Sequence, residues 1–389
     1  MRLFALCLSL LLTPPAFAQT CGGSFSGFVE GLKAEAAAKG YDAATVNAFF
    51  GAARQDQRTL NADRNQGVFR LEFVDFARRI ISGARIRKGA ENASRYDAVF
   101  DAVEAQFGVP RGVLLAFWAL ETDYGAVQGD FNTLNSLVTL AHDCRRPDLF
   151  RPQVFAALEL YRRGQFDLST TGAWAGEIGQ VQMLPADILE RGVDGDGDGR
   201  VSLKTSVPDA LFSGARFLRD IGWRPGQPWL VEVTVPTDLD WSRAGLDSKH
   251  SVSEWLADGV TLRGPAMGAT GDMQATLLLP QGRKGPAFLA FPNYEILFEW
   301  NQSFVYVTTA AYFATRLSGA PVFDAGNPEP GLDGTQMSEL QRRLVARGHD
   351  VGAIDGILGR QTRRAVQAEQ QRLGLPADAW PTATLLNRL

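Results

Sequence analysis

The sequence predicts a mainly α-helical protein with a small β-rich insert and a compact helical unit at its C-terminus. Apolar residues recur at helical spacing through residues 26 to 118 and again through residues 301 to 317. Strand-like alternation is confined to about residues 228 to 290. Residues 319 to 334, rich in proline and glycine, have the composition of a linker and set residues 335 to 389 apart as a separate unit.

The first 18 residues have the features of a secretory signal peptide. Arg2 precedes a short apolar run, and Ala16 to Ala18 supply a cleavage site of the A-x-A kind. The run is too short to cross about 30 Å of hydrocarbon, and we find no other stretch that would. Thr20, just before Cys21, is not the residue expected in a lipoprotein signal. We therefore expect cleavage after Ala18, a periplasmic protein and no transmembrane segment.

Two cysteines remain once the signal peptide, with Cys7, is removed. In an oxidising compartment an even pair favours one disulfide, here between Cys21 and Cys144, which would tether the new N-terminus to a distant loop. The alternative is two buried free thiols.

Composition excludes several classes of function. A formal net charge of −4 argues against nucleic acid as a partner. The three histidines, His142, His250 and His349, lie far apart and lack the H-E-x-x-H spacing of a zinc peptidase. No glycine-rich phosphate-binding fingerprint follows an expected strand.

One expected helix, residues 111 to 122, is apolar on all sides and should therefore be buried. Gly108 is expected to cap the preceding helix, and Pro110 to open this one. Glu121 stands at its end and is either solvated or held in a cleft. The helix pattern by itself favours the solvated alternative. In an apolar pocket, however, its pKa would rise, which suits protonation of a glycosidic oxygen.

Several motifs decide between these alternatives, because they occur in order over about residues 26 to 318. Together they resemble the lytic transglycosylase B family, glycoside hydrolase family 103. The motifs are Gly108-Val109-Pro110 with Glu121 to Gly125, Ala175 to Pro185, Val193 to Gly199, Gly222-Trp223, and Trp300 to Ser303 with Tyr306.

The resemblance implies a lysozyme-like helical catalytic domain, residues 19 to 318, that acts on peptidoglycan glycan strands. Glu121 would protonate the oxygen between MurNAc and GlcNAc and then act as base toward the C6 hydroxyl of the same MurNAc. The product would be a 1,6-anhydro-MurNAc end, and the chemistry would need no cofactor. Intramolecular attack needs no second carboxylate. Asp123 should point elsewhere, and Glu177 is a weaker candidate for such a partner.

The resemblance also implies the groove residues. Gln182, Asn301 and Tyr306 match family positions that line the substrate groove, and the alternative for each is a buried, satisfied polar group. Ala173 and Trp300 depart from the serine and tyrosine common in relatives, which leaves the hydrogen bonding near the acid/base open.

An acidic loop predicts a structural Ca²⁺ site. Asp194, Asp196 and Asp198 occupy positions 1, 3 and 5 of an EF-hand-like loop, in which Arg200 would contribute its carbonyl. Position 12 is threonine rather than glutamate. The family's loop is longer and ends on an aspartate, here Asp209. The alternative is a flexible Asp/Gly turn.

The last unit, residues 335 to 389, resembles the three-helix peptidoglycan-binding domain found on many wall enzymes. Leu340, Leu344, Ala365 and Val366 should form its core, and Asp355-Gly356 a tight turn.

Two other functions remain open at this stage. A hydrolytic muramidase of goose-lysozyme type would use the same Glu121 with water. A catalytically silent wall-binding scaffold would not use Glu121 at all.

Overall fold

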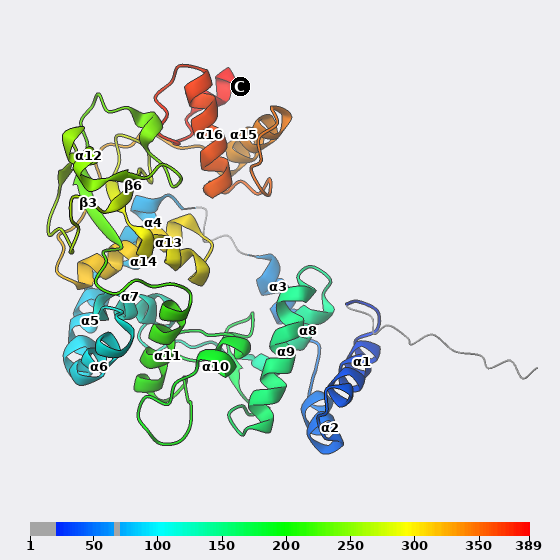
Figure 1. The fold of residues 1–389 in the computed structure, drawn as a ribbon. Coiled ribbons are helices and arrows are strands. Elements are labelled where there is room, and N and C mark those ends of the chain that lie inside the picture. Colours follow the sequence, from blue (N-terminus) through cyan, green and yellow to red (C-terminus); the bar gives the residue numbers. More distant parts are fainter. Residues whose placement is uncertain (1–20, 66–70) are drawn as a thin grey trace, which may run out of the picture.

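The computed structural model describes residues 21–65 and 71–389; the expected signal peptide lies outside these residues. The described chain is mostly helical, with a five-stranded sheet and a C-terminal helical unit side by side at one end of the main helical body (Figure 1). The helices are α1 (Phe25–Ala38), α2 (Ala43–Gly51), α3 (Gln57–Arg64), α4 (Phe73–Ile80), α5 (Gly83–Arg95), α6 (Asp97–Phe107), α7 (Arg111–Thr122), α8 (Thr133–His142), α9 (Pro147–Arg162), α10 (Pro185–Arg191), α11 (Val207–Asp220), α12 (Val252–Ala257), α13 (Pro292–Trp300), α14 (Phe304–Leu317), α15 (Gly334–Ala346), α16 (Arg360–Arg372) and α17 (Ala383–Arg388).

The sheet lies in the insert where strands were expected. Its order is β4-β6-β7-β3-β5, and all neighbouring strands are antiparallel. Central β7 pairs with β3 and β6, so that Leu289 stands opposite both Val231 and Leu277. The strands are β3 (Leu230–Thr234), β4 (His250–Ser251), β5 (Thr261–Leu262), β6 (Gln274–Leu278) and β7 (Ala287–Ala290), and a separate pair in the helical body joins β1 (Phe131–Asn132) to β2 (Thr171–Gly172).

Helix α7 is buried as its apolar sequence predicts, with every residue from Gly112 to Ala119 in the core. It packs closely on α14, and Gly112 permits this approach, because a Cβ there would lie 2.9 Å from the carbonyl oxygen of Ala314. Gly108 caps the preceding helix in the left-handed conformation, with φ of 68°. The end of α7 is thus held at a fixed place inside the protein.

The helical body contains two apolar cores. One surrounds α7 and α14 and extends to the sheet, and the other joins α1 and α2 to α8 and α9. Trp300, at the end of α13, packs against both cores. The disulfide expected between Cys21 and Cys144 is present, with a Cα–Cα distance of 5.2 Å, and fixes the start of α1 beside the end of α8. In the described residues, none of the helices is both long enough and apolar enough to span a bilayer.

The segment predicted as a linker does join α14 to α15, but it is packed rather than loose. Phe323 is buried in the main core, and the amide of Asp324 donates to Glu232 at 2.7 Å. Trp380 of the C-terminal unit donates to the carbonyl of Glu329 at 2.8 Å. Composition indicated flexibility, whereas Phe323 and Asp324 attach the segment to the main core and the sheet, and Glu329 attaches it to the C-terminal unit.

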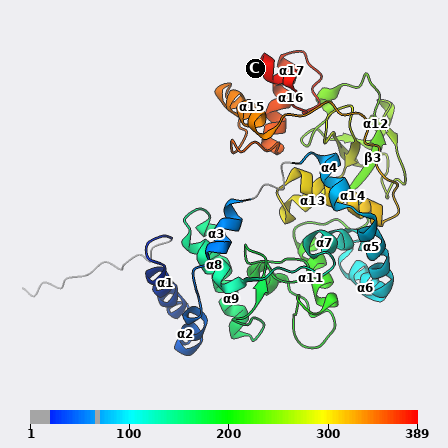
Figure 2. The same ribbon diagram turned by 180° about the vertical axis from the view of Figure 1, so that it is seen from behind.

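The C-terminal unit, α15 to α17, lies beside the sheet at the opposite end of the molecule from α1 and α2 (Figure 2). Its core contains the four residues expected from the sequence, Leu340, Leu344, Ala365 and Val366. The predicted mainly α fold, with a β-rich insert and three C-terminal helices, is therefore confirmed.

Candidate active site

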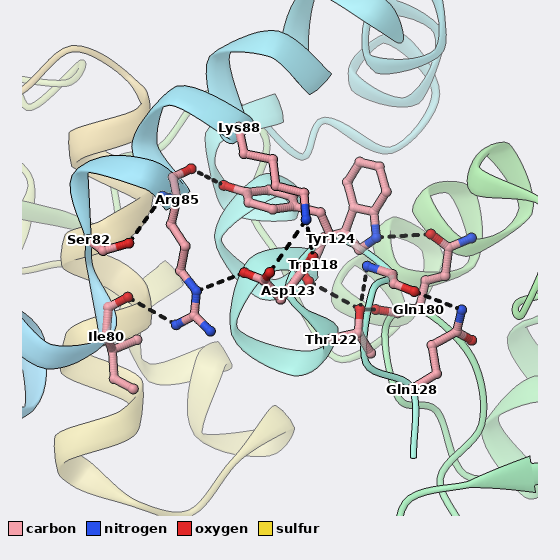
Figure 3. A network of polar contacts seen from close by, with 11 residues as sticks. Ile80, Ser82, Arg85, Lys88, Trp118, Thr122, Asp123, Tyr124, Gln128 and Gln180 are labelled. Carbon is pink, nitrogen blue, oxygen red and sulfur yellow. Dashed lines mark hydrogen bonds and ion pairs between the residues drawn. The ribbon is translucent and has the colours of Figure 1, made fainter. Parts of the chain in front are cut away.

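The chain turns sharply after α7. Asp123 and Tyr124 both have left-handed backbones, with φ of 51° and 60°, which is uncommon for residues other than glycine. Side chains from α5 hold this turn (Figure 3): Asp123 pairs with Arg85 at 2.9 Å and with Lys88, while the Tyr124 hydroxyl donates to the carbonyl of Arg85. Asp123 is thus directed to α5, as expected, and is not a partner of Glu121.

The other side of the turn is joined to the Gly-rich segment that follows β2. Trp118 donates from Nε1 to Gln180 Oε1 at 3.0 Å, and the Thr122 hydroxyl donates to the carbonyl of Gln180 at 2.6 Å (Figure 3). Neither bond was foreseen from the sequence. They set the Gly-rich segment at a fixed position relative to Glu121.

Glu121 lies at a cavity of about 410 Å³ between α7, α13 and the Gly-rich segment. Its Oε1 accepts hydrogen bonds from Trp300 Nε1, at 2.9 Å, and from the hydroxyl of Tyr306 on α14. Phe117 stacks on the Trp300 indole with ring centroids 4.3 Å apart. The cavity lining consists of Glu121, Ala173, Trp174, Glu177, Gln182, Met183, Leu184, Asp187, Phe217, Glu299, Trp300 and Asn301.

Trp300, which stands where a tyrosine is common in relatives, therefore changes the hydrogen bonding of Glu121. The indole of Trp300 supplies one N–H donor directly to the carboxylate, and it cannot accept a proton in return. The hydrogen bonding that the sequence left open thus consists of two donors on one carboxylate oxygen.

Burial raises the pKa of Glu121 from 4.5 to about 7. Hydrogen bonds from Tyr306 and Trp300 oppose this rise because they favour the charged form, while the nearby carboxyl of Glu177 adds to it. A substantial fraction of Glu121 is therefore protonated at neutral pH, as a general acid requires.

Glu177 is a second carboxyl at the same cavity. Burial raises its pKa as well, and its Oε2 is buried without a hydrogen-bond partner among the described residues. Two carboxyls in one poorly solvated cavity disfavour simultaneous ionisation, so Glu177 helps to keep Glu121 protonated.

The expected groove residues occupy different places. Gln182 lines the cavity; its backbone has φ of 50°, and its Nε2 donates to the carbonyl of Gly179 at 2.7 Å. Asn301 also lines the cavity, and its Oδ1 accepts from the amide of Ser303 at 2.9 Å. Tyr306 is instead buried behind Glu121, where it binds the carboxylate. It is better described as a positioning residue than as part of the cavity wall.

The acidic loop gathers three carboxylates. Oxygens of Asp194, Asp196 and Asp209 lie within 4.8 Å of one another, and Asp209 is buried at the first turn of α11. Asp198 is not part of this group. It is exposed, and its carboxylate accepts from the amide of Arg200 at 2.8 Å, so it folds back on its own loop.

The side chain of Asp209 is held in place by hydrogen bonds from the acidic loop. Its two oxygens accept from the amides of Gly195, at 2.8 Å, and Ser202, at 2.7 Å. The side chain of Arg200 donates away from the group, to the carbonyl of Gly164. Carboxylate oxygens at this separation suit a hard cation such as Ca²⁺.

Comparison with known families identifies the two parts of the chain. Residues 24–315 match the model of the Transglycosylase SLT domain, and residues 333–389 match that of the putative peptidoglycan binding domain. The chain belongs to the SLT transglycosylase family. The resemblance found in the sequence motifs is thereby confirmed.

Individual relatives in this SLT family agree with the assignment. The chain is 27% identical over 234 residues to membrane-bound lytic murein transglycosylase B of Escherichia coli K12, an alignment that spans 59% of this chain and 63% of that relative. SltB3 of Pseudomonas aeruginosa, solved in complex with NAG-anhNAM-pentapeptide, is 36% identical with a TM-score of 0.85 and covers 94% of this chain and 99% of its own. Escherichia coli lytic transglycosylase Slt35, solved in complex with calcium, shares the fold at 24% identity and a TM-score of 0.65. The match covers 79% of this chain and 98% of the Slt35 chain.

Proposed function

We propose that this protein is a lytic transglycosylase, which cleaves the MurNAc–GlcNAc bond of peptidoglycan and leaves a 1,6-anhydro-MurNAc end. The observation that supports this most directly is the state of Glu121, a carboxyl with a pKa of about 7 at a cavity large enough for sugar rings. The complex of SltB3 with an anhydro-muropeptide is consistent with the same chemistry.

The reaction needs one residue in two roles. Protonated Glu121 donates its proton to the glycosidic oxygen, so that the C1–O bond breaks and the leaving sugar departs with a hydroxyl. The resulting carboxylate, stabilised by the donors Trp300 and Tyr306, then takes the proton from the C6 hydroxyl as O6 bonds to C1. Glu121 ends protonated and ready for another cycle, and no cofactor is required.

Product analysis tests the proposal. The chain without residues 1 to 18 is incubated with purified peptidoglycan, and released muropeptides are weighed by mass spectrometry. Products lighter than reducing muropeptides by one water support the intramolecular reaction. Reducing ends would instead indicate a muramidase, and no release from folded protein would favour a binding scaffold.

We further propose that the protein works in the periplasm after removal of residues 1 to 18. The support is the signal-like N-terminus together with a disulfide between Cys21 and Cys144, which suits an oxidising compartment. Sequencing the N-terminus of the protein recovered from a periplasmic extract should give Gln19 as its first residue.

The acidic loop is proposed to bind Ca²⁺ for stability rather than for chemistry, through Asp194, Asp196 and Asp209. Calcium at 100 times its dissociation constant should add about 2.7 kcal/mol to the free energy of unfolding, and so raise the Tm of a chain of this length by about 3–4 °C. Differential scanning fluorimetry with calcium and with chelator measures this increment.

The variant Asp209→Asn should lose the increment, whereas Asp198→Asn, in the same loop, should keep it. Asp209→Asn can lower the Tm even without calcium, because Asp209 accepts hydrogen bonds from two loop amides. The comparison is therefore between the Tm increases that calcium causes in each protein, and not between absolute Tm values. A Tm of the unaltered protein that does not respond to calcium would refute the site.

A further inference from the structure

Two arginines of the C-terminal unit lie against the body that contains Glu121. On α16, the guanidinium of Arg363 is 4.2 Å from the ring centroid of Phe304, and its Nη2 donates to the carbonyl of Pro280 at 2.7 Å. One turn earlier, the guanidinium of Arg360 is 5.2 Å from the ring centroid of Phe298. Both are cation–π contacts between the two parts of the chain.

Each of these two phenylalanines lies two residues before a side chain that donates a hydrogen bond to Glu121. Phe304 is the first residue of α14, and Tyr306 on the same turn donates to Glu121 Oε1. Phe298 lies near the end of α13, whose last residue, Trp300, donates to the same oxygen. The arginines of α16 thus cover the beginning of one catalytic segment and the end of the other.

Arg363 is an unusual choice for an interface. Its side chain is 7% exposed, burial lowers its pKa to about 10, and its Nε has no hydrogen-bond partner among the described residues. Burying a charge is costly, and an apolar residue of similar length would seal the contact without that cost. Attachment of the C-terminal unit by itself therefore does not explain this arginine.

Other contacts at the interface serve attachment. Arg364, next along α16, forms an exposed ion pair with Asp247 of the insert. Gln367 donates to the carbonyl of Ala244 at 2.7 Å. In the part of the chain that the structure describes, neither residue forms a hydrogen bond, an ion pair or a cation–π contact with Phe298 or Phe304. The attachment and the contacts with these two rings can therefore be separated by mutation.

We propose that Arg363 and Arg360 are positioning residues for the reaction, which hold Phe304 and Phe298 and thereby set Tyr306 and Trp300 against Glu121. The C-terminal unit then completes the active site as well as binding the wall. This inference rests on the proposed transglycosylase function.

The test uses the full mature chain and a soluble tetrasaccharide muropeptide, so that retention on insoluble wall does not enter. Arg363→Met should lower kcat about 3- to 10-fold with little change in KM. The alkaline limb of its pH–rate profile should move to higher pH, because weaker hydrogen bonds from Tyr306 and Trp300 oppose the effect of burial less. Arg364→Ala is the matched control and should keep both values.

The pH–rate profile reports on Glu121 because the other titratable groups near it are the same in every variant. Tyr306 contacts it from α14, Glu177 adds to its raised pKa, and Asp187 of α10 and Glu299 of α13 line the same cavity. None of these is changed in the variants, so a moved limb would come from altered hydrogen bonding.

A folded Arg363→Met protein with unaltered kcat and pH profile overturns the proposal, as does an equal loss in Arg364→Ala. Arg363→Lys, which keeps a cation, should recover part of the rate. If Arg363→Met does not fold, Arg360→Gln, which is partly exposed, is judged by the same two readouts. Absence of anhydro products from the unaltered protein would refute the proposed function instead, a result that the variants cannot mimic.

Discussion

Replacing Glu121 by glutamine should reduce the release of anhydro-muropeptides by at least about 100-fold, because general acid–base catalysis commonly contributes 10² to 10⁴. Glutamine retains an oxygen for the donors Trp300 and Tyr306, and so preserves the shape of the site while removing the transferable proton. Initial rates on purified peptidoglycan measure the loss. The exposed Glu104 on α6 offers a matched control, since Glu104→Gln should keep full activity.

The same substitution should stabilise the protein at alkaline pH. The pKa of Glu121 rises from 4.5 to about 7 on folding, so the folded state binds more protons than the unfolded state between these values. Stability therefore falls as pH rises through this window, by up to about 3 kcal/mol at about 1.4 kcal/mol per pKa unit. Glu121→Gln has no such dependence.

Thermal unfolding at pH 4 and pH 8 checks this. The Tm of Glu121→Gln should exceed that of the unaltered protein at pH 8 by more than it does at pH 4. Full activity in the folded variant would show that Glu121 is not the catalytic acid. An equal Tm difference at both pH values would show that folding does not raise its pKa.

Local sequence patterns predicted the features that depend on local chemistry. The bounds of α7 follow from Gly108, Pro110 and a run with no polar face, and α7 begins and ends where those signals lie. Strand β3 follows from alternation, because Val231 and Val233 are buried and Glu232 between them is less so, whereas β6 and β7 are buried along almost their whole length. Glu121 became a candidate from its position at the end of an apolar helix and from the motifs around it.

Contacts between distant segments could not be read in the same way. Nothing near position 300 or 306 indicates that both side chains donate to one oxygen of Glu121, since that depends on how α13 and α14 cross α7. In the acidic loop, EF-hand spacing favoured Asp198 and the family resemblance supplied Asp209; folding brings Asp209, and not Asp198, to Asp194 and Asp196. The packed segment around Phe323 was also hidden, because composition reports average flexibility and not a single buried ring.

Tyr306→Phe should have the next largest effect on catalysis. The hydroxyl donates to Glu121 Oε1 and favours the carboxylate, so its removal raises the pKa of Glu121 above about 7. A hydrogen bond to a charged group is worth about 1.5–3 kcal/mol, which corresponds to a shift of about 1–2 pH units. The alkaline limb of the pH–rate profile should move upward by that amount.

Tyr306→Phe should also slow the reaction about 10- to 100-fold at pH 5, where Glu121 is protonated in both proteins, because the carboxylate formed during bond cleavage loses one of its two donors. Tyr312→Phe removes a buried hydroxyl from the same helix that instead accepts from the amide of Phe323, and should alter neither the limb nor the rate. Rates measured from pH 5 to pH 9 separate the two effects. A slower Tyr306→Phe protein with an unmoved limb would mean that this hydroxyl contacts the sugar rather than the acid. A moved limb at full rate would mean that the hydroxyl stabilises the carboxylate of the resting enzyme but does not speed bond cleavage.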